Sequence, residues 1–354
     1  MIDWLTFTIE VAHKKGVFGG FRTNLDEKRN LRSEFTTFAI LQGTHESRLM
    51  VKSQNEVLDT KTGEPMFTQL FVTGNPVKVL QGHNIFGTDD VHALTYAITD
   101  KIIKFFALDI DIQSIKVADV DLKKVDVNYS FNLPNQEAVE RWINSAERSA
   151  SIPYAGRGVL KSSTSLVFSE SSKHWRLKAY GKHKELMARS KTTKLLNPDL
   201  VSFTKNLLRV ELEAKRILKN DNLNNLNNWT MHTPRKLFNE YLSKMNITDN
   251  LIVPDDKLKE LTPSAQAVYM LWLEGHEMKT LYANRQTFYS WRNKLIKQIN
   301  VDIALTRKGG KGKIKHEVPL VEYIKAEPLR LCDIPESLKK ENYFEPLQEQ
   351  RFVA

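Results

Sequence analysis

Hydrophobic and polar residues alternate with a period of two in several stretches of the first 219 residues, and this alternation predicts β-strands with one buried face. In residues 4–11 the hydrophobic set is Leu5, Phe7, Ile9 and Val11. The same reasoning places further strands at residues 67–73, 124–131, 175–182 and 208–215.

Two helices are expected between these strands. Asp89 and Asp90 precede a helical stretch that runs to about Phe106, and acidic residues favour the N-terminal end of a helix. A second helix is expected at residues 136–149. Because strands and helices are mixed without a regular β-α-β order, the pattern predicts an α+β fold, with a mostly antiparallel sheet and flanking helices.

The pattern changes after residue 219. Six of the nine residues in 220–228 are Asn, a residue type that disfavours long regular elements. We therefore interpret residues 220–255 as an Asn-rich linker and connecting segment, which separates a first domain of residues 1–219 from a helical unit of residues 256–320. Residues 321–354 are expected to form a C-terminal tail.

The composition narrows the class of protein. The 354 residues include 52 Lys and Arg against 42 Asp and Glu, a formal net charge of +10, which favours a polyanionic partner such as nucleic acid. Cys332 is the single cysteine, so a disulfide within the chain is excluded, as expected for a reducing cytosol. No apolar run approaches the ~20 residues of a membrane helix, and we expect no membrane partner.

The polar side of three predicted strands carries candidate chemistry. In residues 175–182, Arg176, Lys178, Tyr180 and Lys182 share one face. In residues 124–131 that face carries Lys124, Asp126, Asn128 and Ser130, and in residues 208–215 it carries Arg209, Glu211, Glu213 and Lys215. Side by side, these strands would present carboxylates, lysines and a tyrosine on one open surface.

These residue types suit phosphoryl transfer. A phenol is a weak nucleophile at neutral pH unless a cation or metal stabilises its phenolate, and Lys182 could do this for Tyr180 or neutralise a leaving oxygen. Asp126 and Glu211 supply the hard oxygen ligands that suit Mg²⁺ or Mn²⁺. Tyr180 would then attack phosphorus, cut one strand and hold it as a phosphotyrosine. A solvated sheet face is the alternative interpretation of the same residues.

A dense run of positive charge favours the phosphate interpretation. Residues 173–194 hold eight Lys or Arg and one acid, Glu185, a net charge of +7, whereas an ordinary solvated face mixes signs. From this run we predict that Arg176, Lys178 and Lys184 contact DNA.

The segment PVKVLQGHNIFGT at residues 76–88 resembles the Pro-x-Lys-Val-Leu-Gln-Gly-His-Asn-x-Phe-Gly-Thr segment of the filamentous-phage gene II/X replication initiators. The resemblance covers about residues 1–217, and the length of the chain is closer to the CTX-type branch than to the longer coliphage proteins. Further matching motifs follow in chain order: Met1-Ile2-Asp3, Val125-Asp126, Ala179-Tyr180-x-Lys182-His183-x-Glu185-Leu186, Asn197-Pro198-Asp199-Leu200 and Arg209-Val210-Glu211.

The resemblance implies a rolling-circle initiator that nicks one strand of the double-stranded replicative form, becomes linked to the 5′ end and later rejoins the displaced strand. The nucleophilic tyrosine of the family falls on Tyr180, and the family reaction requires Mg²⁺. No His-x-His metal motif occurs in the chain. His83 could join Asp126 and Glu211 as a ligand or could bind local backbone, and Glu185 and Glu213 are lesser candidates.

The helical unit has the features of a DNA reader. Three helices are expected, at 263–274, 276–282 and 285–298, and the last presents Arg285, Gln286, Tyr289 and Asn293 outward, as a major-groove helix does. The Gly-rich basic run that follows is typical of a hairpin wing that grips phosphates, which makes the unit winged helix-turn-helix-like. The predicted contacts in this run are Arg307, Lys308, Lys311 and Lys313. A plain helical bundle with a solvated loop is the alternative.

Two functions therefore stand open. One is a site-specific endonuclease that acts on double- and single-stranded origin DNA in the host cytoplasm, together with a host helicase and replication machinery. The other is a non-enzymatic DNA-binding regulator of an origin or promoter, whose polar sheet face only grips DNA.

Overall fold

A computed structural model gives the structure of the chain. It describes residues 1–43, 47–152, 156–161, 165–188, 196–247, 258–273, 276–282, 284–299, 301–304, 328–329, 333–340 and 351–353.

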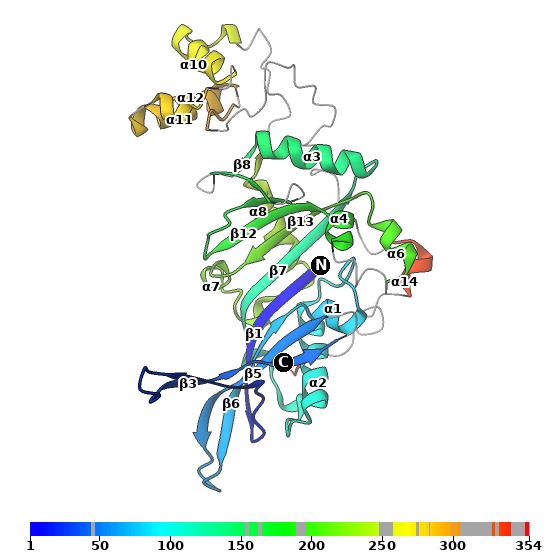
Figure 1. The fold of residues 1–354 in the computed structure, drawn as a ribbon. Helices are drawn as coiled ribbons and strands as arrows, with labels where there is room; N and C mark the ends of the chain where they lie inside the picture. Colours follow the sequence, from blue (N-terminus) through cyan, green and yellow to red (C-terminus); the bar gives the residue numbers. More distant parts are fainter. Residues whose placement is uncertain are drawn as a thin grey trace.

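A nine-stranded sheet dominates the described part of the chain, in the order β10-β11-β12-β13-β7-β1-β6-β5-β4 (Figure 1). Each neighbouring pair is antiparallel. The N-terminal strand β1 lies between β6 and β7, and β13 adds to the far side of β7, so neighbours in the sheet come from distant parts of the sequence. The strands are β1 (Ile2–His13), β4 (Ala39–Gln42), β5 (Arg48–Leu58), β6 (Pro65–Gly74), β7 (Val120–Asn132), β10 (Val159–Lys161), β11 (Ser165–Phe168), β12 (Trp175–Gly181) and β13 (Leu207–Ala214).

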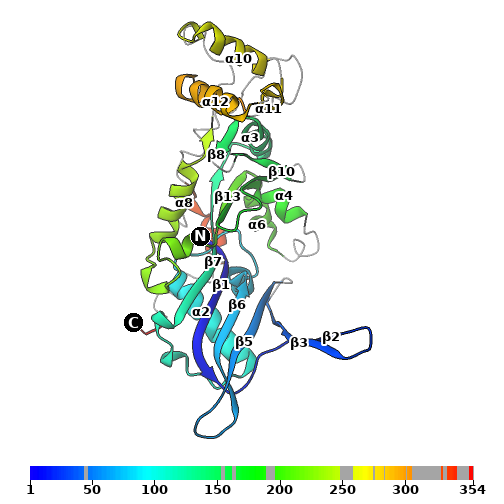
Figure 2. The same cartoon turned by 90° about the vertical axis from the view of Figure 1, so that its left-hand side faces the viewer.

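Helices cover one face of this sheet. The long helix α2 (Val91–Phe106) and helix α8 (Thr233–Ser243) lie along it (Figure 2), and α1 (Pro76–Gln81), α3 (Gln136–Ser149) and α7 (Ile217–Asn220) contribute buried residues to the same cluster. No helix in the described ranges is long and apolar enough to span a membrane. Short elements connect or border these helices: η1 (Ile112–Ser114), η2 (Val117–Asp119), η3 (Leu226–Asn228), α4 (Lys182–Met187), α6 (Pro198–Phe203) and α14 (Glu336–Lys339).

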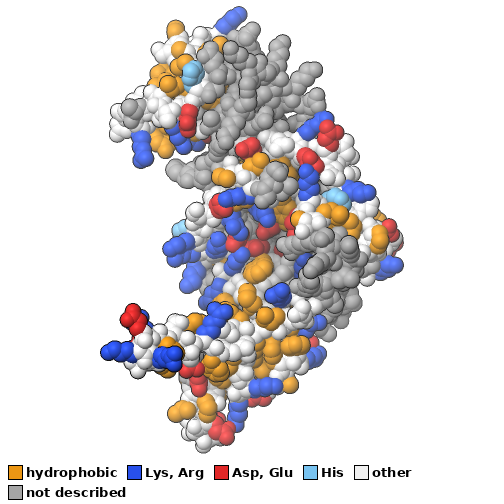
Figure 3. Space-filling view, in the orientation of Figure 1, with side chains coloured by type: hydrophobic (Ala, Val, Ile, Leu, Met, Phe, Trp, Pro, Cys, Tyr) orange, Lys and Arg blue, Asp and Glu red, His pale blue; other side chains and the backbone are white. Residues whose placement is uncertain are grey.

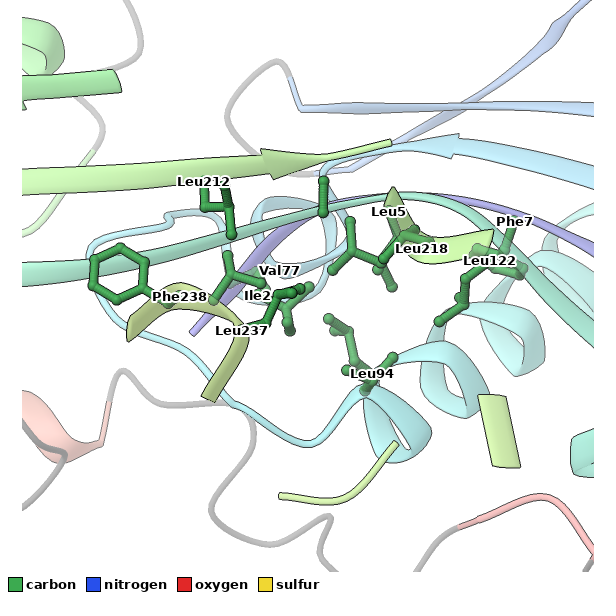
Figure 4. Packing of buried hydrophobic residues seen from close by; sticks show 14 of the residues in the cluster. Ile2, Leu5, Phe7, Val77, Leu94, Leu122, Leu212, Leu218, Leu237 and Phe238 are labelled. Carbon is green, nitrogen blue, oxygen red and sulfur yellow. The ribbon is translucent and has the colours of Figure 1, made fainter. Parts of the chain in front are cut away.

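The main core forms where the hydrophobic side of the alternating strands meets these helices. Leu5 and Phe7 of β1 are fully buried with Leu94 of α2 and Phe238 of α8 (Figure 4). Helix α2 begins where Asp90 accepts a hydrogen bond from the Ala93 amide at 3.0 Å, so the acidic start expected from the sequence is an N-cap. On the opposite face, strands β12, β13 and β7 carry polar and charged side chains.

The structure confirms the α+β fold with a large antiparallel sheet and flanking helices. All five predicted strands and both helices of the first domain are present. Four strands of the main sheet, β4, β5, β10 and β11, and the short helix α1 were not predicted by the hydrophobic pattern. In α1, Asn75 caps the helix through the Lys78 amide and Pro76 occupies the first turn.

The linker interpretation of residues 220–255 is wrong for the first part of that segment. Leu226 and Trp229 are 0% and 3% exposed and belong to the same core as β1. The Asn side chains satisfy backbone groups in tight turns, as when Asn225 accepts from the Asn227 amide. The Asn-rich sequence therefore encodes turns that hold apolar anchors against the sheet.

Helices α10 (Pro263–Leu273), α11 (Met278–Leu281) and α12 (Arg285–Ile299) form a unit with its own buried cluster, which includes Tyr269, Trp272, Phe288 and Leu295. All three helices lie where the sequence predicts them. In α12, Arg292 forms a two-pronged ion pair with Asp302 at 2.6 and 2.7 Å. The predicted wing lies outside the described residues, so the winged form of this unit stays a prediction.

Two smaller sheets accompany the main one. Strands β8 (Ala150–Ile152), β9 (Gly156–Arg157) and β14 (Asn246–Ile247) form a three-stranded sheet. Strands β2 (Gly20–Leu25) and β3 (Leu31–Thr37) form a hairpin that projects from the body (Figures 1 and 2).

A substitution at Trp229 tests whether the Asn-rich segment belongs to the core. Trp229→Ala should lower the free energy of unfolding by about 3–5 kcal/mol, because it removes a buried ring whose Nε1 also donates to the Leu223 carbonyl. Chemical denaturation of the full chain measures this. Met231→Ala, at a side chain 47% exposed, is the control and should change stability by less than about 0.5 kcal/mol. Equal stability of both variants would show that the segment is a linker after all.

Candidate active site

The polar face of β12, β13 and β7 gathers ionisable side chains. Strand register forms two rows across β12, β13 and β7. In one row Lys178, Glu211 and Asn128 lie side by side. In the next row, two residues along each strand, Arg176, Glu213 and Asp126 lie side by side. Residues paired across antiparallel strands point to the same face. The surface expected from the sequence therefore forms, but its central side chains are buried rather than open: Asp126, Glu213 and Tyr180 are 4–5% exposed.

The Tyr180 hydroxyl donates a hydrogen bond to Glu211 Oε2 at 3.2 Å. The ammonium of Lys178 lies 4.4 Å from the centre of the Tyr180 ring. Burial raises the pKa of the Tyr180 phenol well above its usual value, and the charge of Glu211 raises it further. The phenol is therefore held as a hydrogen-bond donor beside a proton acceptor.

Asp3, Asp126 and Glu211 form an acidic cluster around this pair. Burial is the main cause that raises the pKa of Asp126 and of Glu211, and the negative charge of Asp3 raises both further. Lys124 and Lys178 act in the opposite direction on Asp126 and Glu211 respectively. The three acids therefore repel one another in a buried place, and Lys124 and Lys178 offset part of that repulsion.

Glu213 is the carboxylate with the most cations around it. Its oxygens lie 2.7 Å from Lys124, 2.5 Å from Arg176 and 3.3 Å from Lys215. Burial raises the pKa of Glu213, but the hydrogen bond from Lys124 and the surrounding positive charges hold it below its ordinary value. Glu213 therefore remains ionised and ties three basic residues to the site.

The loop of residues 82–87, at the centre of the gene II/X-like segment, is fastened to the site by Arg209. This guanidinium is fully buried and donates to the carbonyls of Asn84 and Ile85, each at 2.5 Å. It also donates to Ser130 Oγ at 3.1 Å. Asn84 in turn donates to both carboxylate oxygens of Asp3 at 2.9 and 3.0 Å. The loop is thereby joined to β1, β7 and β13.

Lys182 is fully buried, but it contacts the loop rather than the tyrosine. Strand β12 ends at Gly181, one residue earlier than the pattern predicts, and Lys182 begins α4. Its ammonium donates to Asn84 Oδ1 at 2.9 Å and to Glu185 Oε2 at 2.8 Å. Burial lowers the pKa of Lys182 to about 8. Glu185, a lesser metal candidate, is therefore the ion-pair partner of Lys182.

His83 is turned into its own loop. It is 2% exposed, its ring packs edge-on against Phe86, and its Nδ1 accepts from the Ile85 amide at 3.4 Å. This corresponds to the second alternative raised by the sequence, a histidine that binds local backbone.

No three His, Cys, Asp or Glu side chains of the described residues lie close enough together to hold one metal ion, so the structure does not bring Asp126, Glu211 and His83 together as a ready set of ligands. The donor chemistry nevertheless fits a hard cation. Asp126 Oδ1 and Asn128 Oδ1 are buried and accept no hydrogen bond within the described part of the chain, and Glu211 lies beside them. Asp126, Asn128 and Glu211 thus offer oxygen ligands on one face.

The predicted DNA contacts divide into three groups. Arg176 and Lys178 lie in the site, on Glu213 and over Tyr180, whereas Lys184 pairs with Glu140 of α3 at 2.8 Å. On α12, Arg285, Gln286, Tyr289 and Asn293 are exposed, as predicted. Arg307, Lys308, Lys311 and Lys313 lie outside the described residues.

Sequence reasoning left Asp3, Asn128 and Arg209 without a role. Asn128 and Arg209 appear on the correct face in the period-two pattern, and Asp3 appears only as part of a matching motif. Their residue types could have identified them. Each places a charged or amide side chain between apolar neighbours on a buried strand, where a polar group without a partner is costly.

Known proteins are similar to this chain over most of its length. A family model described as the N-terminal part of the phage replication-associated protein of gene II matches residues 1–232. The chain is 30% identical over 336 residues to the replication-associated protein of Enterobacteria phage I2-2, covering 93% of this chain and 94% of that protein. The chain belongs to the gene II replication-associated protein family.

Other relatives in the gene II family match a smaller part. The chain is 28% identical over 172 residues to the replication-associated protein of Enterobacteria phage M13, covering 42% of this chain and 40% of that protein. A solved structure, "Structure of Rolling Circle Replication Initiator Protein from Geobacillus stearothermophilus", aligns with a TM-score of 0.28 and 10% identity, covering 86% of this chain and 98% of that chain. A likeness of that size carries no argument about this gene II-family chain.

A conservative substitution tests the role of Arg209 in fastening the loop. Arg209→Lys should lower the free energy of unfolding by about 1–3 kcal/mol, because one ammonium cannot replace the guanidinium at Ser130, Asn84 and Ile85 and leaves buried carbonyls unpaired. Thermal and chemical unfolding measure it. Arg216→Lys, at an exposed arginine just beyond β13, should be neutral. A neutral Arg209→Lys would mean that the loop is held by other contacts.

Proposed function

We propose that this chain is a phage rolling-circle replication initiator that nicks one strand of double-stranded replicative-form DNA at the origin and later rejoins the displaced strand. Membership of the gene II family supports the role in phage replication. The observation that carries the chemistry is the hydrogen bond from the Tyr180 hydroxyl to Glu211 Oε2 on the polar face of the sheet.

Tyr180 is the nucleophile in this proposal. As its Oη attacks phosphorus, the phenolic proton passes to Glu211, which already accepts the hydrogen bond. The bond between phosphorus and the 3′ oxygen breaks, the 3′ oxygen leaves and takes up the proton that Glu211 received, and the 5′ phosphate remains on Tyr180. The reverse step, with a free 3′ hydroxyl as nucleophile, rejoins the strand and returns the proton to the tyrosine.

The surrounding cations favour this step. Lys178 over the Tyr180 ring stabilises negative charge as it develops on the phenol, and Arg176 can reach the phosphate from the same face. Lys182 acts as a positioning residue, because it joins α4 to the loop through Glu185 and Asn84.

Mg²⁺ is the expected cofactor, and Mn²⁺ can substitute. Asp126, Asn128 and Glu211 would hold the ion, and when bound it would polarise the scissile phosphate and offset the developing charge. His83, turned into its loop, would be outside that set.

The helical unit would supply origin selection. The exposed Arg285, Gln286, Tyr289 and Asn293 lie on one side of α12, on a unit with a separate core, and this suits a helix that enters the major groove. A host helicase would then unwind the nicked duplex.

Tyr180→Phe provides the test of the nucleophile. The variant should lose nicking of supercoiled origin DNA and the covalent protein–DNA adduct by at least about a thousandfold, because no other group replaces the phenolic oxygen, while binding to origin DNA changes little. Gel assays for open circles and for labelled adduct, both with Mg²⁺, measure the loss.

Tyr129→Phe is the matched control. Tyr129 is also a buried tyrosine that donates to a carboxylate, Asp89 Oδ2 at 2.8 Å, but it lies on the strand next to β13 with its ring against Phe238 in the core. This variant should nick normally. If Tyr180→Phe still nicks, the assignment fails, and if the wild-type protein binds the origin without nicking it, the chain is the non-enzymatic regulator.

The metal assignment has its own test. Asp126→Ala and Asn128→Ala should each raise the Mg²⁺ concentration needed for half-maximal nicking by about tenfold or more, since each removes an oxygen ligand and leaves the proton acceptor Glu211 in place. Asp121→Asn, on the same strand β7 but 37% exposed and paired with Lys123, should leave the requirement unchanged. Normal nicking by both alanine variants at limiting Mg²⁺ would contradict the assignment.

A further inference from the structure

The polar face of the sheet continues beyond the acidic cluster onto β1, β6, β5 and β4, and its character changes there. Register places Thr6 opposite Thr73, Phe71 opposite Lys52, and Met50 opposite Ile40. The half of the face on β12, β13 and β7 is charged, whereas this half carries aromatic, apolar and hydroxyl side chains. Figure 3 shows the two zones on one side of the molecule, with Lys, Arg, Asp and Glu gathered in the middle and hydrophobic side chains below them.

The zone begins beside the proposed active site at Trp4. Trp4 lies opposite Asp126 in the sheet, and the Lys124 ammonium is 5.3 Å from the centre of the indole. The indole Nε1 donates to Thr6 Oγ1 at 3.3 Å and to Thr73 Oγ1 at 3.2 Å. The ring is thus held in place and remains partly exposed.

The zone ends at the β4 edge with a second aromatic group. The Phe38 and Phe71 rings lie 5.7 Å apart, and Phe38 is 38% exposed. The Lys52 ammonium lies 6.0 Å from the centre of the Phe38 ring. Ile40 and Met50, which are 48% and 36% exposed, complete the surface.

A lysine ammonium therefore lies near an aromatic ring at three places across the sheet. Lys178 lies over Tyr180, Lys124 over Trp4, and Lys52 over Phe38, which is next to Phe71. Aromatic platforms with interleaved cations suit a single-stranded nucleic acid, whose bases stack on the rings while its phosphates meet the lysines. Within the protein, the Glu213 carboxylate holds the Lys124 ammonium at 2.7 Å and the Thr36 carbonyl holds the Lys52 ammonium at 2.9 Å. A protein partner or a second copy would explain the apolar residues but does not call for lysines fixed among them.

We propose that this surface, named here the aromatic track and formed by Trp4, Thr6, Phe38, Ile40, Met50, Lys52, Phe71, Thr73 and Lys124, binds single-stranded DNA that leads to or from Tyr180. The proposal rests on the proposed function for the identity of the strand, because that function generates single-stranded DNA at the site. It adds the path that the strand takes, from β7 across β1, β6 and β5 to β4.

The dimensions of the track set the length of strand it holds. Between Glu211 on β13, beside Tyr180, and Ile40 on β4, at the far end of the track, there are five strand spacings, or about 24 Å at ~4.8 Å each. At ~3.4 Å per stacked nucleotide this corresponds to about seven nucleotides. Affinity should therefore rise with oligonucleotide length up to about that size.

The test measures binding of fluorescein-labelled oligothymidylates of 4, 8 and 16 nucleotides to the full chain by anisotropy, with EDTA present so that no cleavage occurs. The double variant Phe38→Leu/Phe71→Leu should bind the 16-mer at least about fivefold more weakly than wild type. Wild type should gain affinity mainly between 4 and 8 nucleotides. Circular dichroism and thermal unfolding check that the variant is folded.

A charge variant keeps the proposal testable if the double variant is unstable. Lys52→Gln should lower the slope of log affinity against log salt concentration by about 0.7, the loss of one phosphate contact on a single strand. Phe105→Leu and Lys219→Gln are matched controls: Phe105 is 55% exposed on α2 and Lys219 is exposed on α7, both outside the track. Both should bind like wild type.

Unchanged binding of the 16-mer by the Phe38/Phe71 and Lys52 variants would overturn the track. If those variants instead change self-association in sedimentation while binding stays the same, the surface is a contact between copies and the proposal is wrong. The binding measurement needs no cleavage, so it is independent of the Tyr180→Phe result. If Tyr180→Phe still nicks DNA, the assignment of the nucleophile fails but the aromatic track is unaffected. If the track variants bind normally, the track fails but the assignment of Tyr180 is unaffected.

Discussion

Compensation of buried negative charge is the constraint on which the site and much of the sheet depend. Strand β13 sends Leu208, Val210 and Leu212 into the core and Arg209, Glu211 and Glu213 to the other face, where they are also largely buried. Carboxylates removed from water are stable only beside cations or hydrogen-bond donors. The strands on either side of β13 supply these cations. The charge balance of the site therefore depends on the order of the strands in the sheet.

The same constraint explains the loop of residues 82–87. A loop laid against a sheet needs partners for its carbonyls, and the buried guanidinium of Arg209 provides them while it also reduces the charge of the acidic cluster. Asn84 links that loop to Asp3 and to Lys182, so the motif most characteristic of the family is a structural connector between β1, α4 and β13. Its histidine serves the loop itself.

Period-two alternation was sufficient to predict the five strands and the face on which Tyr180, Glu211 and Asp126 meet, because one buried face fixes the register of a strand. It could not predict burial on the second face, since alternation does not show what covers polar residues. It did not predict β4, β5, β10 or β11 of the main sheet. In the Asn-rich segment the turn-forming residues hid Leu226 and Trp229, which are buried in the core. The contacts of Lys182 depend on β12 ending at Gly181. Hydrophobic periodicity does not determine the last residue of a strand.

The position of β1 between β6 and β7 has a consequence for synthesis of the chain. The acidic cluster takes Asp3 from the first strand, Asp126 from the middle of the chain and Glu211 from β13, and β13 pairs only with β12 and β7. Pairings between distant segments form late, because loop closure costs entropy before any contact compensates for it. A nascent chain that has not yet produced β13 has no assembled site, so the candidate active site forms only when more than half of the protein has been made.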